Sequence, residues 1–135
     1  MNKINYSLEE FHRDCHILST QIINDYQPTS IVMLVRGGIP VGAWIAQSFQ
    51  TKYIYTSACV PSGGVNGKVL FISDICRSAE TIRKVFNNTL SKEIHVTYKL
   101  ACIHYSPTES DLVPDFYVRE ISPDDWIHYP WEFMV

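Results

Sequence analysis

Two short runs of consecutive apolar residues place the strongest constraint on the fold of this chain. Residues 31–35 and 69–72 are entirely apolar, and each run leads into a turn of glycine or small polar residues. Both faces of such a strand must be covered, as they are inside a parallel sheet. Helix-compatible segments follow the two turns, at 39–50 and from about 79 to 90. This order predicts an α/β fold with a mostly parallel sheet flanked by helices.

A capping box predicts an earlier helix. In the sequence Ser7-Leu8-Glu9-Glu10, the Ser7 hydroxyl and the Glu10 carboxylate are spaced to bond the free amides of a first helical turn. An apolar stripe at helical spacing continues until Gln27-Pro28 ends it. Three further strands are expected at residues 53–55, 94–103 and 116–118.

Length and composition limit the class of protein. The 135 residues fit one domain, 1–135, and the apolar fraction of 46% is enough to bury a core. The formal charge of −3, with scattered Lys and Arg, argues against nucleic acid or a membrane surface as partner. The four cysteines show no C-x-x-C pairing, and no apolar stretch resembles a signal peptide. We therefore expect a cytoplasmic protein that binds small molecules or other proteins.

The segment after the 69–72 strand has the residue types of a phosphate and ribose site. Free amides at a helix start, with the hydroxyls of Ser78 and Thr81, suit a phosphate, and the Asp74 carboxylate suits a ribose diol. An ordinary turn with Ser78 as helix N-cap is the alternative. Because ligands bind at the carboxyl ends of parallel strands, we expect the loop at Arg36 to lie beside this segment.

Residues 69–81 resemble the phosphoribosyl-pyrophosphate motif of type I phosphoribosyltransferases, an apolar strand followed by D-D-x-x-D-T-G-x-T. Three other segments are similar to the same family in the same order. Residues 6–14 resemble the opening helix of the xanthine-guanine branch, and residues 35–42 resemble the pyrophosphate loop. Residues 125–132 resemble the W-I-x-x-P-W-E element, whose first Trp stacks on the purine. The resemblance implies a single-domain type I phosphoribosyltransferase fold with a small carboxyl-terminal base-binding element.

The resemblance also implies a set of substrate-binding residues. They are Arg36, Gly37 and Gly38 for pyrophosphate, Asp74 for the ribose and Mg²⁺, Arg77 beside the base, Ser78, Ala79 and Thr81 for the 5′-phosphate, and Trp126 and Ile127 for the base. Asp74 and Arg36 are the residues expected to be catalytic. The expected partners are a nucleobase with phosphoribosyl pyrophosphate, or a nucleotide, and further copies of the chain in a homo-oligomer.

Four positions depart from the family pattern. Ser73 replaces the first acid of the motif, so that only Asp74 remains. Arg77 replaces the carboxylate near the purine N7, and a guanidinium cannot act as a general base at neutral pH. Glu80 would repel a phosphate unless Arg77 pairs with it, and the other position expected for Arg77 is the base pocket. Ser106 replaces a lysine that contacts the exocyclic oxygen of the purine.

Two functions are consistent with these residues. The first is a purine-type phosphoribosyltransferase that transfers phosphoribosyl from phosphoribosyl pyrophosphate to a nucleobase, as in purine salvage, and releases pyrophosphate. The second is a catalytically degenerate homologue that binds a nucleotide or a protein partner. Trp126 and Trp131 also have a simpler interpretation as hydrophobic anchors of the carboxyl-terminal segment.

Overall fold

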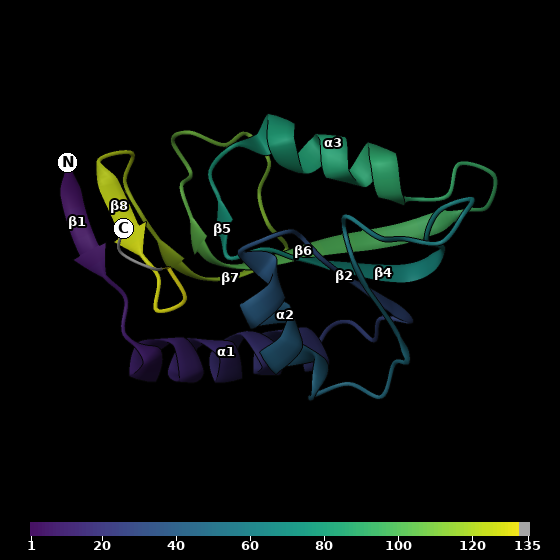
Figure 1. The fold of residues 1–135 in the computed structure, drawn as a ribbon, viewed down its shortest axis with the longest axis horizontal. Coiled ribbons are helices and arrows are strands. Elements are labelled where there is room, and N and C mark those ends of the chain that lie inside the picture. The colour runs from purple at the N-terminus through teal and green to yellow at the C-terminus, as the bar shows by residue number, and fades with distance from the viewer. Residues whose placement is uncertain (133–135) are drawn as a thin grey trace.

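Within residues 1–132, which the structure describes, six strands form a parallel sheet covered by helices on both faces (Figure 1). In this computed structural model the strand order is β3 (Tyr53–Thr56), β2 (Ser30–Met33), β4 (Gly67–Ile72), β6 (Val96–Tyr105) and β5 (Ile75–Cys76), and β7 (Phe116–Glu120) also pairs with β6. The helices are α1 (Leu8–Ile23), α2 (Gly38–Ala46) and α3 (Ala79–Thr89). Figure 1 shows α1 and α2 on one side of the sheet and α3 on the other.

The central strand β4 packs against both helical layers. Its side chains alternate, so that Leu70 and Ile72 join the core under α1 and α2, while Val69 and Phe71 join the core under α3. All four side chains are completely buried. Burial on both faces explains the uninterrupted apolar run in the sequence, and it confirms the predicted parallel sheet.

The predicted helices form, with one difference in length. At the start of α1 the Ser7 hydroxyl accepts a hydrogen bond from the Glu10 amide at 3.1 Å, and the Glu10 carboxylate accepts one from the Ser7 amide at 3.2 Å. The helix expected at 39–50 ends at Ala46. The amides of residues 47–49 bond carbonyls three residues back, so the last part of that segment is a tighter turn.

A second, two-stranded sheet was not predicted. It pairs β1 (Asn2–Asn5) in parallel with β8 (Asp125–His128), and it lies at one end of the molecule (Figure 1). All four β1 residues are exposed and show no apolar alternation, which is why the sequence pattern does not reveal the strand. The partner strand lies more than a hundred residues away in the sequence.

A buried polar cluster connects the small sheet to the large one. Asp14 of α1 is 1% exposed and accepts hydrogen bonds from the Tyr6 hydroxyl at 2.5 Å and from Arg119 Nε at 2.6 Å. Nearby, His104 Nδ1 lies 2.9 Å from the Tyr129 hydroxyl. Burial lowers the pKa of His104 to about 4, so its imidazole is neutral at physiological pH.

No helix among residues 1–132 is both long enough and apolar enough to cross a membrane.

The neutral, buried His104 predicts a loss of stability in mild acid. The unfolded chain takes up a proton near the ordinary histidine pKa of 6.5, whereas the folded pKa is about 4. Stability is therefore full above pH 6.5 and falls as the pH drops to about 4, by about 3 kcal/mol for this group. Urea unfolding across this pH range measures the effect. His104→Asn should lower the free energy of unfolding at neutral pH, but this free energy should fall less in acid than that of the wild type. An equal fall in both proteins would contradict the assignment of a neutral, buried His104.

Candidate functional site

The loop after β2 and the loop after β4 lie against each other at the carboxyl ends of these strands. A Cβ on Gly37 would overlap the Asp74 carboxylate, and a Cβ on Gly38 would overlap the Ile72 carbonyl oxygen. Both positions therefore require glycine. The Leu34 amide donates to the Ile72 carbonyl at 2.9 Å and extends the pairing of β2 with β4 into the two loops. The expected adjacency of the loops is confirmed.

The two loops enclose a cleft of about 280 Å³, called the loop cleft below. Six of the predicted site residues line it: Gly37, Gly38, Asp74, Arg77, Ser78 and Thr81. The Gly38 amide donates to the Leu34 carbonyl at 2.8 Å and is occupied. In the described part of the chain, the amides of Arg36 and Gly37 donate no hydrogen bond. Those two amides are the donors that this loop offers to an anion.

Asp74 is the only acidic residue among the described residues that line the loop cleft. Burial raises the pKa of its carboxyl, and hydrogen bonds from the amides of Asp74 and Ile75 and from the Ser73 hydroxyl partly offset this increase. None of the ion pairs found within residues 1–132 involves Asp74. A partly buried carboxylate without a cationic partner is suited to bind a cation or a hydroxyl donor.

The same carboxylate is compatible with magnesium. Within residues 1–132, no group of three or more His, Cys, Asp or Glu side chains is placed to hold a metal ion. Mg²⁺ does not need such a group, because it commonly takes one or two protein carboxylates and completes its shell with water and substrate phosphates. Asp74 therefore fits as its single protein ligand.

The start of α3 forms the second wall of the loop cleft. The Ser78 and Thr81 hydroxyls lie 3.0 Å apart, and the Ser78 side chain makes no capping bond to a backbone amide. Ser78 is therefore the N-cap residue of α3, as the alternative interpretation expected, but its side chain does not cap the helix. The Ala79 side chain is buried in the core beneath the helix, so its possible contribution to ligand binding is its amide. The exposed Glu80 lies 3.6 Å from Lys84 along the helix surface.

Arg77 lines the loop cleft but binds the carboxyl-terminal element. Its terminal nitrogen NH2 donates to the carbonyl of Asp125 at 2.6 Å and to that of Ser122 at 3.4 Å. Its Nε lies 2.9 Å from a carboxylate oxygen of Glu109, outside hydrogen-bond geometry, so this contact is electrostatic. The expected pairing of Arg77 with Glu80 is wrong, because Glu80 lies on the outer surface of α3.

Glu109 is a residue of this site that the sequence analysis missed. One of its carboxylate oxygens accepts a hydrogen bond from the Ser106 hydroxyl at 2.6 Å and is the same oxygen that faces Arg77. Ser106 is completely buried. The spacing Ser106-Pro107-Thr108-Glu109 is that of a capping box, and this signal could have linked the two residues.

Four predicted site residues do not line the loop cleft: Arg36, Trp126, Ile127 and Ala79, whose buried side chain is described above. Arg36 is exposed beside it, and no ion pair within residues 1–132 neutralises its charge. Trp126 is 52% exposed on β8, whereas the Ile127 side chain is buried in the core, which leaves its backbone to contact a ligand. Trp131 stacks on Tyr129, with ring centroids 4.7 Å apart. The hydrophobic-anchor interpretation thus fits Trp131 and does not fit Trp126.

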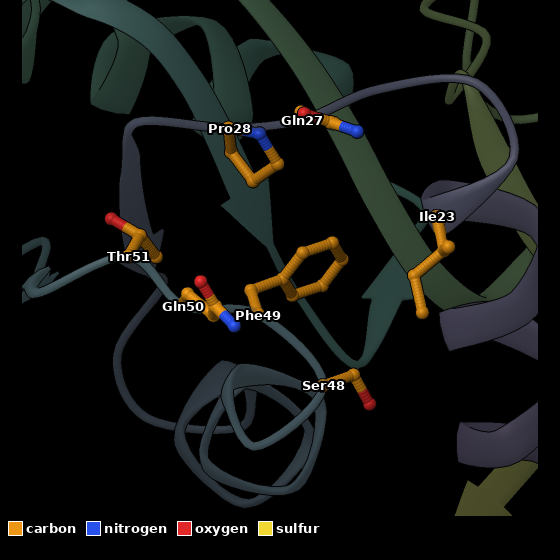
Figure 2. A pocket seen from close by; sticks show the side chains of 7 residues that line it. All are labelled: Ile23, Gln27, Pro28, Ser48, Phe49, Gln50 and Thr51. Carbon is orange, nitrogen blue, oxygen red and sulfur yellow. The ribbon is translucent and has the colours of Figure 1, made fainter.

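A second pocket, of about 330 Å³, lies at the opposite edge of the sheet (Figure 2). It is formed where α1 and α2 end and where the chain enters β2 and β3, and Figure 2 shows the Phe49 ring among the lining side chains. None of the described lining residues carries a charge. This pocket therefore lacks the groups that a phosphorylated ligand would need.

The chain is similar to known phosphoribosyltransferases, although no protein-family model matches it. A xanthine-guanine phosphoribosyltransferase of Gluconobacter oxydans is 24% identical over 143 residues, which cover 92% of this chain and 81% of the relative. The enzyme of the same name from Chromohalobacter salexigens is 28% identical over 145 residues, covering 96% and 83%. The crystal structure of a purine phosphoribosyltransferase from Pyrococcus horikoshii matches with a TM-score of 0.82 at 21% identity, covering 100% and 97%.

The architecture is therefore the type I phosphoribosyltransferase fold. Within that fold, the similarity in both sequence and structure is to purine enzymes, which confirms the resemblance seen in the motifs.

The raised pKa of Asp74 predicts that its charge destabilises the folded protein. Asp74→Asn should therefore raise the melting temperature at neutral pH. The difference should disappear in acid, because the wild-type carboxyl takes up a proton as the pH falls through its raised pKa. Thermal unfolding at both pH values measures this effect.

Asp125→Asn is a matched control, for which the change in melting temperature should have the opposite sign. The pKa of the half-buried Asp125 is lowered, chiefly by a hydrogen bond from the Ser122 amide. Asp125→Asn should therefore lower the melting temperature at neutral pH. A loss of stability in Asp74→Asn as well would show that the Asp74 carboxylate is needed for the fold.

Proposed function

We propose that the protein is a purine-type phosphoribosyltransferase that transfers phosphoribosyl from phosphoribosyl pyrophosphate to a nucleobase and releases pyrophosphate. The observation that carries this proposal is the loop cleft, in which one partly buried carboxylate, a glycine loop with free amides and a helix start with two hydroxyls meet. These are the groups needed for a ribose, a diphosphate and a monophosphate. The named relatives in sequence and in structure are phosphoribosyltransferases, which supports an enzyme.

Each wall of the loop cleft has a distinct part in the proposal. The amides of Arg36 and Gly37, with the unpaired Arg36 guanidinium beside them, bind the departing pyrophosphate and stabilise its developing charge. The first amides of α3 and the Ser78 and Thr81 hydroxyls hold the 5′-phosphate. Asp74 accepts hydrogen bonds from the ribose hydroxyls. Binding at these three places orients the ribose carbon for attack by the base.

Magnesium is the cofactor in this proposal, with Asp74 as its protein ligand. When bound, the ion neutralises charge on the pyrophosphate and makes it a better leaving group. A cytoplasmic location and a homo-oligomer remain predictions.

The main alternative is a protein that binds a nucleotide without turnover. It is favoured by one observation, the absence of any acidic residue other than Asp74 among the described residues that line the loop cleft. Among the described lining residues no second carboxylate is available to take a proton from the base while Asp74 holds the ribose, and the Arg77 guanidinium cannot do so. We therefore expect slow turnover with 6-oxopurines even if the enzyme proposal holds.

A direct assay separates the two functions. The purified protein, incubated with phosphoribosyl pyrophosphate, Mg²⁺ and hypoxanthine, guanine, xanthine or adenine in turn, should release pyrophosphate with at least one base. Asp74→Asn should abolish this release while remaining folded. Binding of guanosine monophosphate without pyrophosphate release would support the alternative, and the absence of both would refute the nucleotide site.

Two tryptophans test the base-binding element as a matched pair. Trp126→Ala should raise the KM for the base, or the Kd for guanosine monophosphate, by about 2–10-fold, because one ring stack is lost. Its melting temperature should change little, since Trp126 is half exposed. Trp131→Ala should instead lower the melting temperature, because Trp131 packs on Tyr129 and Phe11. Equal losses of stability in both variants would make Trp126 a packing residue.

A further inference from the structure

The small β1–β8 sheet has no strand in common with the large sheet among the described residues. It is connected to the rest of the molecule by the side chains between the two sheets and by the turn that leads into β8. This turn begins at Ser122, and the first residue of β8 after it is Asp125. Since Trp126 comes next, the position of the turn sets the position of the proposed base platform.

The turn is closed by its own hydrogen bonds. The Asp125 amide donates to the Ser122 carbonyl at 3.0 Å, and the Ser122 amide donates to the Asp125 carboxylate at 2.9 Å. Both carbonyl oxygens of these residues accept hydrogen bonds from one nitrogen of Arg77, at 3.4 Å for Ser122 and 2.6 Å for Asp125. Arg77 lies one residue before the Ser78 that opens α3, so it joins this turn directly to the wall of the loop cleft.

The other side of the guanidinium is also fixed. Its Nε lies 2.9 Å from Glu109, and the same Glu109 oxygen accepts a hydrogen bond from the buried Ser106 at 2.6 Å. The Arg77 and Glu109 side chains are only 24% and 31% exposed. Together Arg77, Glu109 and the two turn carbonyls form what we call the Arg77 bridge.

We propose that Arg77 is a positioning residue, which holds β8 and Trp126 in place relative to the start of α3. This inference rests on the proposed function in one respect only, namely that Trp126 binds the base. Two of the guanidinium nitrogens are engaged, one with Glu109 and one with the turn. An arginine suits this task because its planar fork reaches an acid and backbone carbonyls at once, which the single ammonium of a lysine does less well.

Hydrogen exchange tests the Arg77 bridge without any ligand. In Arg77→Met, which keeps an unbranched apolar side chain, amides of residues 122–128 should exchange at least about tenfold faster than in the wild type, because charge-assisted hydrogen bonds are lost. Arg83→Met is the matched control. Arg83 lies on α3 and pairs with Asp111 at the surface, so its loss should leave residues 122–128 unchanged. Unchanged exchange in Arg77→Met would overturn the proposal.

Two probes then separate positioning from direct contact. Arg77→Met should weaken binding of guanosine monophosphate by about tenfold, but it should leave binding of ribose 5-phosphate, which has no base, unchanged. Arg77→Lys should restore part of the lost affinity. A similar loss for ribose 5-phosphate would show that Arg77 contacts the phosphate and would overturn a purely positioning role. If the wild type binds neither probe, the proposed function fails, whereas the exchange experiment still decides whether the bridge holds β8.

Discussion

The parallel pairing of β2 with β4 is the constraint on which the rest of the site depends. It brings the carboxyl ends of both strands to one place, and the hydrogen bond from the Leu34 amide to the Ile72 carbonyl continues the pairing into the loops. The loops then approach so closely that the Asp74 carboxylate occupies the space of a side chain at position 37. Glycine there is thus a consequence of strand geometry, and burial of the carboxylate is a consequence of the same approach.

Sequence patterns revealed the helices and strands whose signals lie in neighbouring residues. The 69–72 strand was predictable because it is covered on both faces, and α1 because its capping box and apolar stripe are encoded in neighbouring residues. Strand β1 was not predictable, since its residues are exposed and its partner is distant in the sequence. The adjacency of the Arg36 and Asp74 loops was predicted from strand direction together with the expectation that one ligand touches both loops. The roles of these residues in binding remain predictions.

The site differs from expectation at Arg77, which has more than one acidic residue within reach. Arg77 and Glu80 are three residues apart, but Ser78 between them has an extended backbone. Arg77 therefore lies before the start of α3, and the two side chains do not share a helix face. It turns toward β8, whereas Glu80 follows the outer surface of α3 and pairs with Lys84. Glu109 was missed for the same reason, because its importance depends on the direction that Arg77 takes. In the resulting arrangement Glu80 lies in the first turn of α3, where its exposed carboxylate faces Lys84.

The pairing of β1 with β8 has a consequence for how the protein is made. Residues 2–5 are synthesised long before their partners at 125–128, and contacts this distant in the sequence form late because of the entropy of closing the intervening loop. The central sheet, with Asp74 and the glycine loop, has all its strands before this point is reached. A nascent chain therefore completes the sheet that carries the loop cleft before it completes the β1–β8 sheet that carries Trp126. During that interval, the first strand has no partner and presents an open edge to other chains.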